Sequence, residues 1–196
     1  MKFIKTLSLV LALMLVAGFA FAQAKDTASF EKFKSENGSF AFDPTFTTLN
    51  KKALTQNTMS KTSNKWYALA LMEFKGAATV AVEDGAVHYT IQKPGPEVHS
   101  VQLVQHVDIA KGYKYTLSFE AKASKARDIV VKISGDDTKG WALYSEQYTP
   151  SLTTDYQKFE YTFVMGASSD SAARLDFNLG TNASDVWIKN VKLTAE

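Results

Sequence analysis

Hydrophobic and polar residues alternate strictly over one stretch of the chain. In residues 111–124, KGYKYTLSFEAKAS, the odd positions from Tyr113 to Ala121 are apolar and the even positions from Lys114 to Lys122 are polar. Alternation of this length predicts a β-strand with one face in the core and the other in solvent. Because the even face carries no aromatic ring, we expect it to be a solvated surface and not a binding groove.

Similar short segments follow one another from Trp66 onward. They are rich in Val, Ile, Tyr, Phe or Thr, which favour strands, and turn residues such as Asp84-Gly85 and Pro94-Gly95-Pro96 separate them. The predicted strands are Thr79–Glu83, Ala86–Gln92, Ser100–Val107, Tyr113–Lys122, Ile129–Ser134, Gln157–Met165, Ala173–Leu179 and Val186–Leu193. Many short strands without a competing amphipathic helix predict an all-β fold, a β-sandwich or jelly roll of two antiparallel sheets.

The first residues have the features of an export signal. Lys2 and Lys5 precede the apolar run Leu7–Phe21, and Ala20-Phe21-Ala22 is a small-residue cleavage pattern. We therefore predict a secretory signal peptide that is cleaved after Ala22 or after Ala24. The run is short for a membrane anchor and no second apolar stretch follows, so no membrane span is expected. A secreted or periplasmic protein is predicted, and with no cysteine it has no disulfide.

The remainder of the chain, residues 23–196, is predicted to be a single domain after the signal peptide of residues 1–22. From Lys25 to Lys65 the sequence is polar and rich in Thr, Ser, Asn and Lys, with aromatic residues such as Phe40 between them. We expect an N-terminal strand and long loops here, with a helical turn near Ser29–Lys34. No internal repeat and no linker divides the chain further.

The charge balance argues against nucleic acid as a partner. The chain has 22 Lys and Arg against 20 Asp and Glu, and removal of Lys2 and Lys5 with the signal peptide leaves 20 of each. Binding of a polyanion needs clustered basic residues, and no Lys/Arg run occurs. We expect a monomer.

The histidines do not suggest a metal site. His88, His99 and His106 are 11 and 7 residues apart, which matches no compact pair of metal ligands, and no cysteine could complete a set. We expect all three in exposed strand or loop positions.

Six segments in order resemble a known family. They are 83–91 (EDGAVHYTI), 100–105 (SVQLVQ), 112–123 (GYKYTLSFEAKA), 152–159 (LTTDYQKF), 173–180 (ARLDFNLG) and 186–193 (VWIKNVKL), with 37–40 (NGSF) as an opening strand. This series resembles carbohydrate-binding modules of the family 4/9/16/22 type (CBM4/9-like) over nearly the whole mature chain. The resemblance implies a β-sandwich jelly roll with a groove on one concave sheet. In that family the groove binds β-linked polysaccharides such as xylan, β-glucan, cellulose or mannan.

The chain departs from the family at a structural calcium site. Family members often use an acidic residue of the last strand as a calcium ligand, where this chain has Lys189, and Ser39 stands where an acidic residue is common in the opening strand. Calcium prefers several oxygen ligands, usually including carboxylates. We therefore predict no calcium at this site and no cofactor.

Aromatic side chains are the first candidates for sugar contacts, because a ring can stack on the apolar face of a sugar. Trp141 and Tyr144 follow a polar turn and belong to no clean core alternation. Trp66 and Tyr67 begin the ordered part of the chain. Trp66 matches a family position that is often structural, so core packing and binding both remain open for it. For Trp187, sheet packing is favoured.

Polar side chains that point away from the core are the second group of candidates. Gln102 and Asn178 each lie between two apolar strand residues and match positions where family members place an amide. Four weaker candidates share this outward parity: Arg174, Asp176, Gln92 and His88. Strand parity assigns a face but does not tell which of the two sheets carries the groove.

Two other functions remain open beside non-catalytic binding of a β-linked polysaccharide in support of separate glycoside hydrolases. A small jelly-roll hydrolase would need two carboxyl groups about 5–5.5 Å or about 6.5–9.5 Å apart. Glu120 and Glu160 have outward parity, but Lys122 and Lys158 lie beside them, as on a solvated surface. The third possibility is an envelope protein that uses the same fold to bind another protein.

Overall fold

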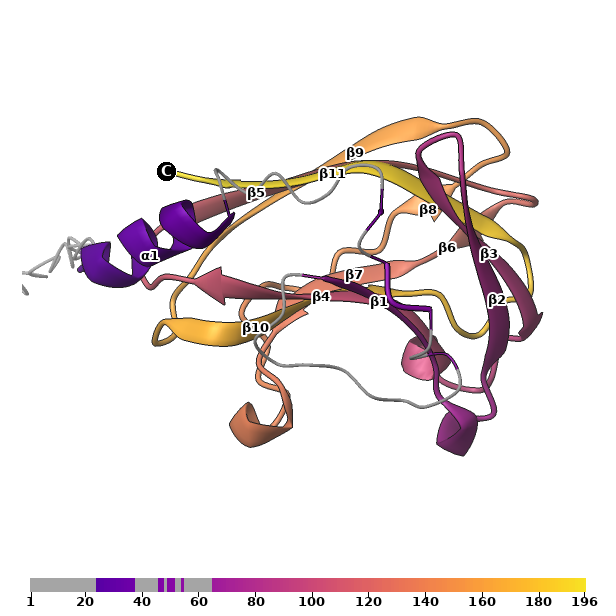
Figure 1. The fold of residues 1–196 in the computed structure, drawn as a ribbon, viewed down its shortest axis with the longest axis horizontal. Helices are drawn as coiled ribbons and strands as arrows, with labels where there is room; N and C mark the ends of the chain where they lie inside the picture. Colours follow the sequence, from indigo (N-terminus) through magenta and orange to yellow (C-terminus); the bar gives the residue numbers. More distant parts are fainter. Residues whose placement is uncertain (1–23, 38–45, 48, 52–53, 55–64) are drawn as a thin grey trace, which may run out of the picture.

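The chain folds into two β-sheets packed face to face (Figure 1). This computed structural model describes residues 24–37, 46–47, 49–51, 54 and 65–196. The four-stranded sheet has the order β1 (Trp66–Ala70), β4 (Val101–Ile109), β10 (Asp170–Asn178), β7 (Val130–Ser134). The five-stranded sheet has the order β2 (Ala77–Glu83), β3 (Ala86–Lys93), β11 (Val186–Ala195), β5 (Lys114–Ala123), β9 (Gln157–Val164). Two short strands, β6 (Arg127–Asp128) and β8 (Ser151–Leu152), form a separate pair.

All of these strand pairs are antiparallel. The predicted all-β sandwich of two antiparallel sheets is confirmed, and each of the eight predicted strands is present with small shifts at its ends. The predicted signal peptide (1–22) and residues 38–40 of the predicted opening strand lie outside the described residues.

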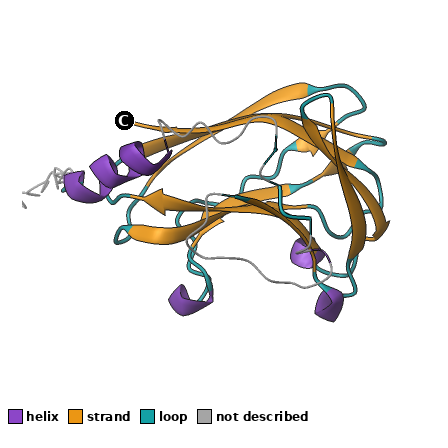
Figure 2. Cartoon of the chain, viewed as in Figure 1, coloured by secondary structure: helices purple, strands orange, loops and turns teal. Residues whose placement is uncertain are grey.

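The helical elements are short. Helix α1 (Thr27–Asn37) extends beyond the turn predicted at Ser29–Lys34. Single 3-10 turns span Met72–Phe74, Val98–Ser100 and Asp137–Lys139. Figure 2 shows these three turns along the outer side of the four-stranded sheet, away from the five-stranded sheet. None of the helices among the described residues has the length and apolar character needed to cross a membrane.

The core lies between the two sheets and is rich in aromatic rings. On β5 the odd positions Tyr115, Leu117 and Phe119 are fully buried while the even positions keep solvent contact, as the alternation predicts. Phe119 meets Phe177 of the opposite sheet edge to face, with ring centroids 5.0 Å apart. Tyr89 crosses the core as well, and its hydroxyl donates to the main-chain carbonyl of Gln102 at 2.8 Å. Such contacts hold the two sheets in a fixed relative position.

The outer face of the four-stranded sheet is partly buried too, at its β1 edge, which distinguishes it from the five-stranded sheet. All five residues of β1 are buried. Trp66 and Ala68 pack into the main core, whereas Tyr67 and Leu69 form a second small cluster with Val104 on the outer face.

Contrary to the prediction of three exposed histidines, His106 is buried, with 4% of its surface accessible. It lies on the central strand β4, and its Nδ1 is 2.9 Å from the carbonyl oxygen of Ala172. Burial lowers the pKa of His106 because it disfavours the charged imidazolium. His88 is partly buried because its ring stacks on Trp187, with centroids 4.1 Å apart.

Candidate functional site

The outer face of the four-stranded sheet carries polar side chains in rows set by the strand register. Antiparallel partners on adjacent strands point to the same face. One row across β1, β4, β10 and β7 is Leu69, Gln102, Asn178 and Val130. The next row is Tyr67, Val104, Asp176 and Lys132. Arg174 follows on β10, opposite His106 of β4.

A cavity of about 710 Å³ lies over these rows, and we call it the groove. Its volume is within the range of about 300–1,000 Å³ that is typical of ligand sites. The groove floor consists of the residues Leu69, Gln102, Asn178, Val130, Asp176, Lys132 and Arg174. The walls come from segments next to the two edge strands: Glu73, Phe74, Val98 and His99 near β1, and Asp137 and Trp141 after β7.

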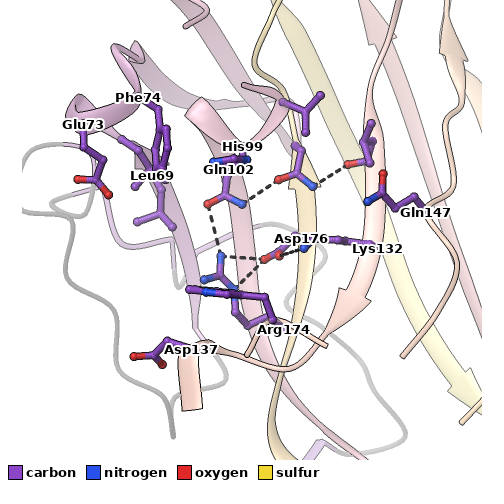
Figure 3. A pocket seen from close by; sticks show the side chains of 15 residues that line it. Leu69, Glu73, Phe74, His99, Gln102, Lys132, Asp137, Gln147, Arg174 and Asp176 are labelled. Carbon is purple, nitrogen blue, oxygen red and sulfur yellow. Dashed lines mark hydrogen bonds and ion pairs between the residues drawn. The ribbon is translucent and has the colours of Figure 1, made fainter. Parts of the chain in front are cut away.

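The polar floor is a continuous series of hydrogen bonds (Figure 3). Arg174 Nη2 donates to Gln102 Oε1 at 3.4 Å, and Gln102 Nε2 donates to Asn178 Oδ1 at 2.8 Å. Asn178 Nδ2 then donates to the carbonyl oxygen of Val130 at 3.2 Å. We call Gln102 and Asn178 the amide row. Planar amides held in this way can donate to and accept from hydroxyl groups of a ligand.

Asp176 supplies the negative charge of the floor. Its carboxylate is 1% exposed and lies 3.0 Å from Arg174 Nη2 and 3.8 Å from Lys132 Nζ. A buried carboxylate needs such partners because removing its charge from water is costly. Two cationic side chains, Arg174 and Lys132, therefore surround one carboxylate in the floor.

The walls provide aromatic surfaces. Trp141 is half-exposed, and the guanidinium carbon of Arg174 lies 5.1 Å from its ring centroid. On the other wall, Phe74 and His99 meet edge to face with centroids 4.4 Å apart. Amides below and rings at the sides are groups that suit a ligand with both hydroxyl groups and flat apolar faces.

Four predicted binding residues meet in the groove: Trp141, Gln102, Asn178 and Arg174. Asp176, like Arg174 a weaker candidate, joins them. They come from β4, β10 and the loop after β7, so only the folded sheet brings them together.

Three other predicted binding residues lie outside the groove, two on β1 and one in the loop after β7. Trp66 is fully buried, with centroids 5.3 Å from Phe46 and 6.3 Å from Phe177, and has no surface to offer a ligand. Of the two roles left open for it, the structure supports core packing. Tyr67 faces outward but is 3% exposed, because Leu69 and Val104 cover it. Tyr144 packs against the core, and its hydroxyl donates to Asp170 Oδ2 at 2.7 Å.

Burial, together with the Asp170 contact, raises the pKa of Tyr144. None of these three side chains lines the groove. Gln92 also lies outside it, on β3 of the other sheet, where its Nε2 donates to Thr79 Oγ1 at 3.3 Å. The same holds for His88.

Several groove residues were not predicted from the sequence. Lys132 has outward parity on β7, and the same rule that selected Gln102 would have selected it. Phe74 and His99 lie in 3-10 turns whose position depends on long-range contacts, so no local pattern marks them.

Glu120 and Glu160 lie outside the groove, on the even face of the five-stranded sheet. Glu160 is paired with Ser118 in the β5–β9 register. Glu120 Oε1 accepts from Asn190 Nδ2 at 2.8 Å, and its Oε2 lies 3.6 Å from Lys189 Nζ. These contacts are typical of a solvated surface, as predicted for this face.

The surroundings of Lys189 do not fit a calcium ion. Its ammonium group lies near the Glu120 carboxylate and 4.0 Å from the ring centroid of Tyr156. A fixed positive charge at this place would repel a cation. Across the part of the chain that the structure describes, no three His, Asp or Glu side chains are grouped to hold a metal ion.

Comparison with known proteins gives consistent results. A family model described as a carbohydrate binding domain matches residues 37–185. A solved structure described as "CBM4 structure and function" is similar, with 29% identity, a TM-score of 0.62, and coverage of 68% of this chain and 88% of the other. A search of curated proteins found no match.

Two further structures share the fold. The second N-terminal cellulose-binding domain of Cellulomonas fimi β-1,4-glucanase C has 22% identity and a TM-score of 0.52, with 67% of this chain and 85% of that chain covered. An N-terminal cellulose-binding domain of the same enzyme has 19% identity and a TM-score of 0.50, with 67% of this chain and 88% of that chain covered.

Proposed function

Because the chain belongs to the carbohydrate-binding domain family, we propose that its groove binds a β-linked polysaccharide of the xylan, β-glucan, cellulose or mannan class without cleaving it. The observation that carries the proposal is the half-exposed ring of Trp141 beside the amide row in one open cavity. The ring can stack on the C–H face of a sugar, and the amides can bond to its hydroxyl groups.

Weak binding is expected from so few contacts. A dissociation constant between about 1 mM and about 1 μM corresponds to about −4 to −8 kcal/mol. One stacked ring and a few hydrogen bonds in a preformed site can supply that free energy.

The chemistry of the floor supports binding over hydrolysis. Asp176 is 1% exposed and is held by Arg174 and Lys132, so its carboxyl group is engaged within the floor, and no second carboxyl group stands opposite it among the residues that form the floor. Glu120 and Glu160 belong to the other sheet. The protein would therefore hold a polysaccharide near separate glycoside hydrolases.

The test uses the protein from Gln23 onward in affinity gels that contain xylan, mixed-linkage β-glucan, glucomannan, cellulose derivative or laminarin. Released reducing sugar is assayed in parallel, and serum albumin serves as the non-binding control. Retarded migration without sugar release is the expected result and names the ligand class. Sugar release would indicate a small hydrolase. If the protein is neither retarded nor releases sugar, a role in binding another protein is favoured.

We further propose that the protein is secreted or periplasmic and acts as a monomer. The sequence of residues 1–22 supports export. Signal-peptide removal is tested by the N-terminal sequence of protein recovered outside the cytoplasm, and the oligomeric state by sedimentation.

Stability without calcium is also proposed, because the Lys189 ammonium group takes the place of a cation beside Glu120. Dialysis against a chelator should leave the melting temperature unchanged. A fall of several degrees that added calcium reverses would contradict this.

A further inference from the structure

We propose that Arg174 is the positioning residue of the groove, which sets the orientation of both the amide row and the Trp141 ring. The proposal rests on the proposed function insofar as these groups contact a sugar. The positioning itself can be measured in the protein without any ligand.

Arg174 gives the amide row a single direction. A glutamine amide has a donor end and an acceptor end, and a half-turn exchanges them. A guanidinium group can only donate, so its bond to Gln102 Oε1 at 3.4 Å directs Nε2 of the same amide to Asn178 Oδ1. Asn178 in turn directs its Nδ2 to the Val130 carbonyl group.

The fixed direction has a consequence for binding. Each amide nitrogen carries two hydrogens, and the row uses one of them. The second hydrogen of Gln102 Nε2 and of Asn178 Nδ2 is then held in a defined direction at the floor of the groove, where the two residues keep 4% and 2% of their surface exposed. A row of hydrogen bonds that starts at a charged donor is polarised along its length. Because the two amides are already oriented in the free protein, binding a ligand does not cost the conformational entropy of ordering them.

The same guanidinium group supports the aromatic wall. Its central carbon lies 5.1 Å from the ring centroid of Trp141, within the distance of a cation–π contact. The Arg174 side chain is 8% exposed whereas Trp141 is half-exposed. The guanidinium group therefore backs the ring and leaves much of the indole open to a ligand.

Asp176 fixes the position from which Arg174 contacts both Gln102 and the Trp141 ring. Its Oδ1 accepts from Nε and lies 3.0 Å from Nη2. This contact fixes the plane of the guanidinium group. Lysine cannot reproduce it, because an ammonium group is a point charge without a planar fork.

The primary variant is Arg174→Lys, which keeps a positive charge beside Asp176 so that the fold is retained. We expect the side-chain NH₂ signals of Gln102 and Asn178 to shift in nitrogen–proton NMR spectra. The acrylamide quenching constant of Trp141 fluorescence is obtained by subtracting the signal of Trp141→Phe. This constant should also change by about twofold, because the indole ring loses its contact with the guanidinium group. Lys189→Arg, an equally conservative exchange on the other sheet, should change neither reading.

Affinity measurements separate positioning from direct contact. Arg174→Lys should weaken glycan binding by about tenfold. If Arg174 acts through Gln102 and Trp141, adding Arg174→Lys to the double variant Gln102→Ala/Trp141→Ala, in which both groups are already absent, should weaken binding by no more than about twofold further. If Arg174 instead contacts the sugar independently, the fold-losses should multiply, which would overturn the proposal.

Each remaining outcome is also decisive. Unchanged NH₂ signals and unchanged quenching in Arg174→Lys would overturn the proposal whatever the affinity. If the wild-type protein binds no glycan but these readings shift, positioning by Arg174 stands and the proposed function fails. If Arg174→Lys does not fold, the double variant Arg174→Gln/Asp176→Asn, which removes both charges together, replaces it in the same NMR and quenching measurements.

Discussion

Trp141 combines an exposed ring with an uncommon backbone conformation. Its φ is +59°, in the left-handed region, and Gly140 before it has φ +61°. A non-glycine residue persists in this region only where neighbouring contacts enforce it. Here the Asp136 carbonyl oxygen accepts from Trp141 N at 3.0 Å, and the Asp136 carboxylate accepts from Thr138 N at 2.9 Å. The turn therefore holds the indole at the groove wall at a local cost in backbone energy.

Replacing Trp141 with alanine should weaken glycan binding by about tenfold, since stacked aromatic rings dominate many binding sites. The free energy of unfolding should fall by no more than about 1–2 kcal/mol, because the ring is half-exposed and loses mainly its cation–π contact with Arg174. Isothermal titration and urea unfolding measure the two quantities. Leu143→Ala is the matched control: Leu143 is equally exposed in the same loop but does not line the groove. Unchanged affinity in Trp141→Ala would remove the ring from the site.

Arg127 is the other arginine that organises its surroundings, and its role is structural. Its guanidinium group donates to five main-chain carbonyl groups, those of Asp128, Leu179, Gly180, Asn182 and Ser184. Burial lowers the pKa of Arg127 to about 10, so it remains charged at neutral pH. One side chain thus fixes the loop between β10 and β11.

Arg127→Met should lower the free energy of unfolding by about 3 kcal/mol, because several buried carbonyl groups lose their donor together. Urea unfolding at pH 7 measures this loss. Lys125→Met removes an exposed cation two residues earlier and should stay within about 0.5 kcal/mol of wild type. Equal effects of the two variants would show that the five bonds contribute nothing specific.

Helix α1 is an element that needs tertiary contacts to form. Eleven residues are marginal for an isolated helix. Asp26 caps it by accepting from Ser29 N at 3.1 Å and also accepts from Ser169 Oγ. Hydrogen bonds from Ser169 and Ser29 lower the pKa of Asp26. Phe30 stacks on Tyr113 with centroids 3.7 Å apart, at the end of the sandwich where Figure 1 shows α1 beside β5.

Phe30→Ala should therefore release α1 while the sandwich stays folded. We expect main-chain amide exchange in α1 to rise by about tenfold or more, since the opening free energy of a docked segment depends on its few buried contacts. Glycan affinity should not change, because no α1 residue lines the groove. The control Glu31→Ala removes an exposed side chain on the same helix. An exchange rate equal to that of wild type would mean that the ring stack does not dock the helix.

Strands that place polar residues on one face could be predicted from the sequence, even where both faces are buried as in β4 and β10, whereas β1 could not. The alternation of β5 identified the strand and its core face correctly. In β1 the run WYALA is buried on both faces and has no alternation. The pattern therefore does not predict a strand here, and it leaves Trp66 and Tyr67 among the candidate ligand contacts although both are buried.

For the candidate site, the sequence did not tell which outward-facing side chains lie on the same sheet. Outward parity selected Gln102 and Asn178, which lie together in the groove, and Gln92, which lies on the other sheet. Parity is a local property, whereas the pairing of β4 with β10 joins segments about seventy residues apart. Only that pairing decides which outward side chains share a surface.

At the scale of the whole molecule, the outer faces of the two sheets differ. The five-stranded sheet has a solvated outer face, and the four-stranded sheet carries the groove. Two buried tyrosines of the five-stranded sheet form hydrogen bonds to the main chain through their hydroxyl groups. Tyr89 donates to the carbonyl group of Gln102 below the groove, and Tyr115 Oη accepts from Ala110 N at 2.7 Å. Burial raises the pKa of Tyr89, and that of Tyr115 to about 12.

These buried hydroxyl groups should make the fold sensitive to alkali. Between pH 10 and pH 12 the unfolded tyrosine ionises while the folded Tyr115 stays protonated, so the folded state binds more protons. The stability that Tyr115 contributes is therefore complete below pH 10 and is lost as the pH rises towards 12. The loss should be about 1–3 kcal/mol, at about 1.4 kcal/mol per pKa unit.

Comparison of wild type with Tyr115→Phe isolates this effect. At pH 8 the variant should be less stable by about 1–3 kcal/mol, because Ala110 N loses its acceptor. The difference should narrow steadily from pH 10 to pH 12, since phenylalanine has no proton to lose. Arg127, whose lowered pKa acts in the opposite sense over the same range, is present in both proteins and cancels. Urea unfolding at each pH measures the difference, and a difference that stays constant to pH 12 would mean that Tyr115 ionises equally in the folded and unfolded states.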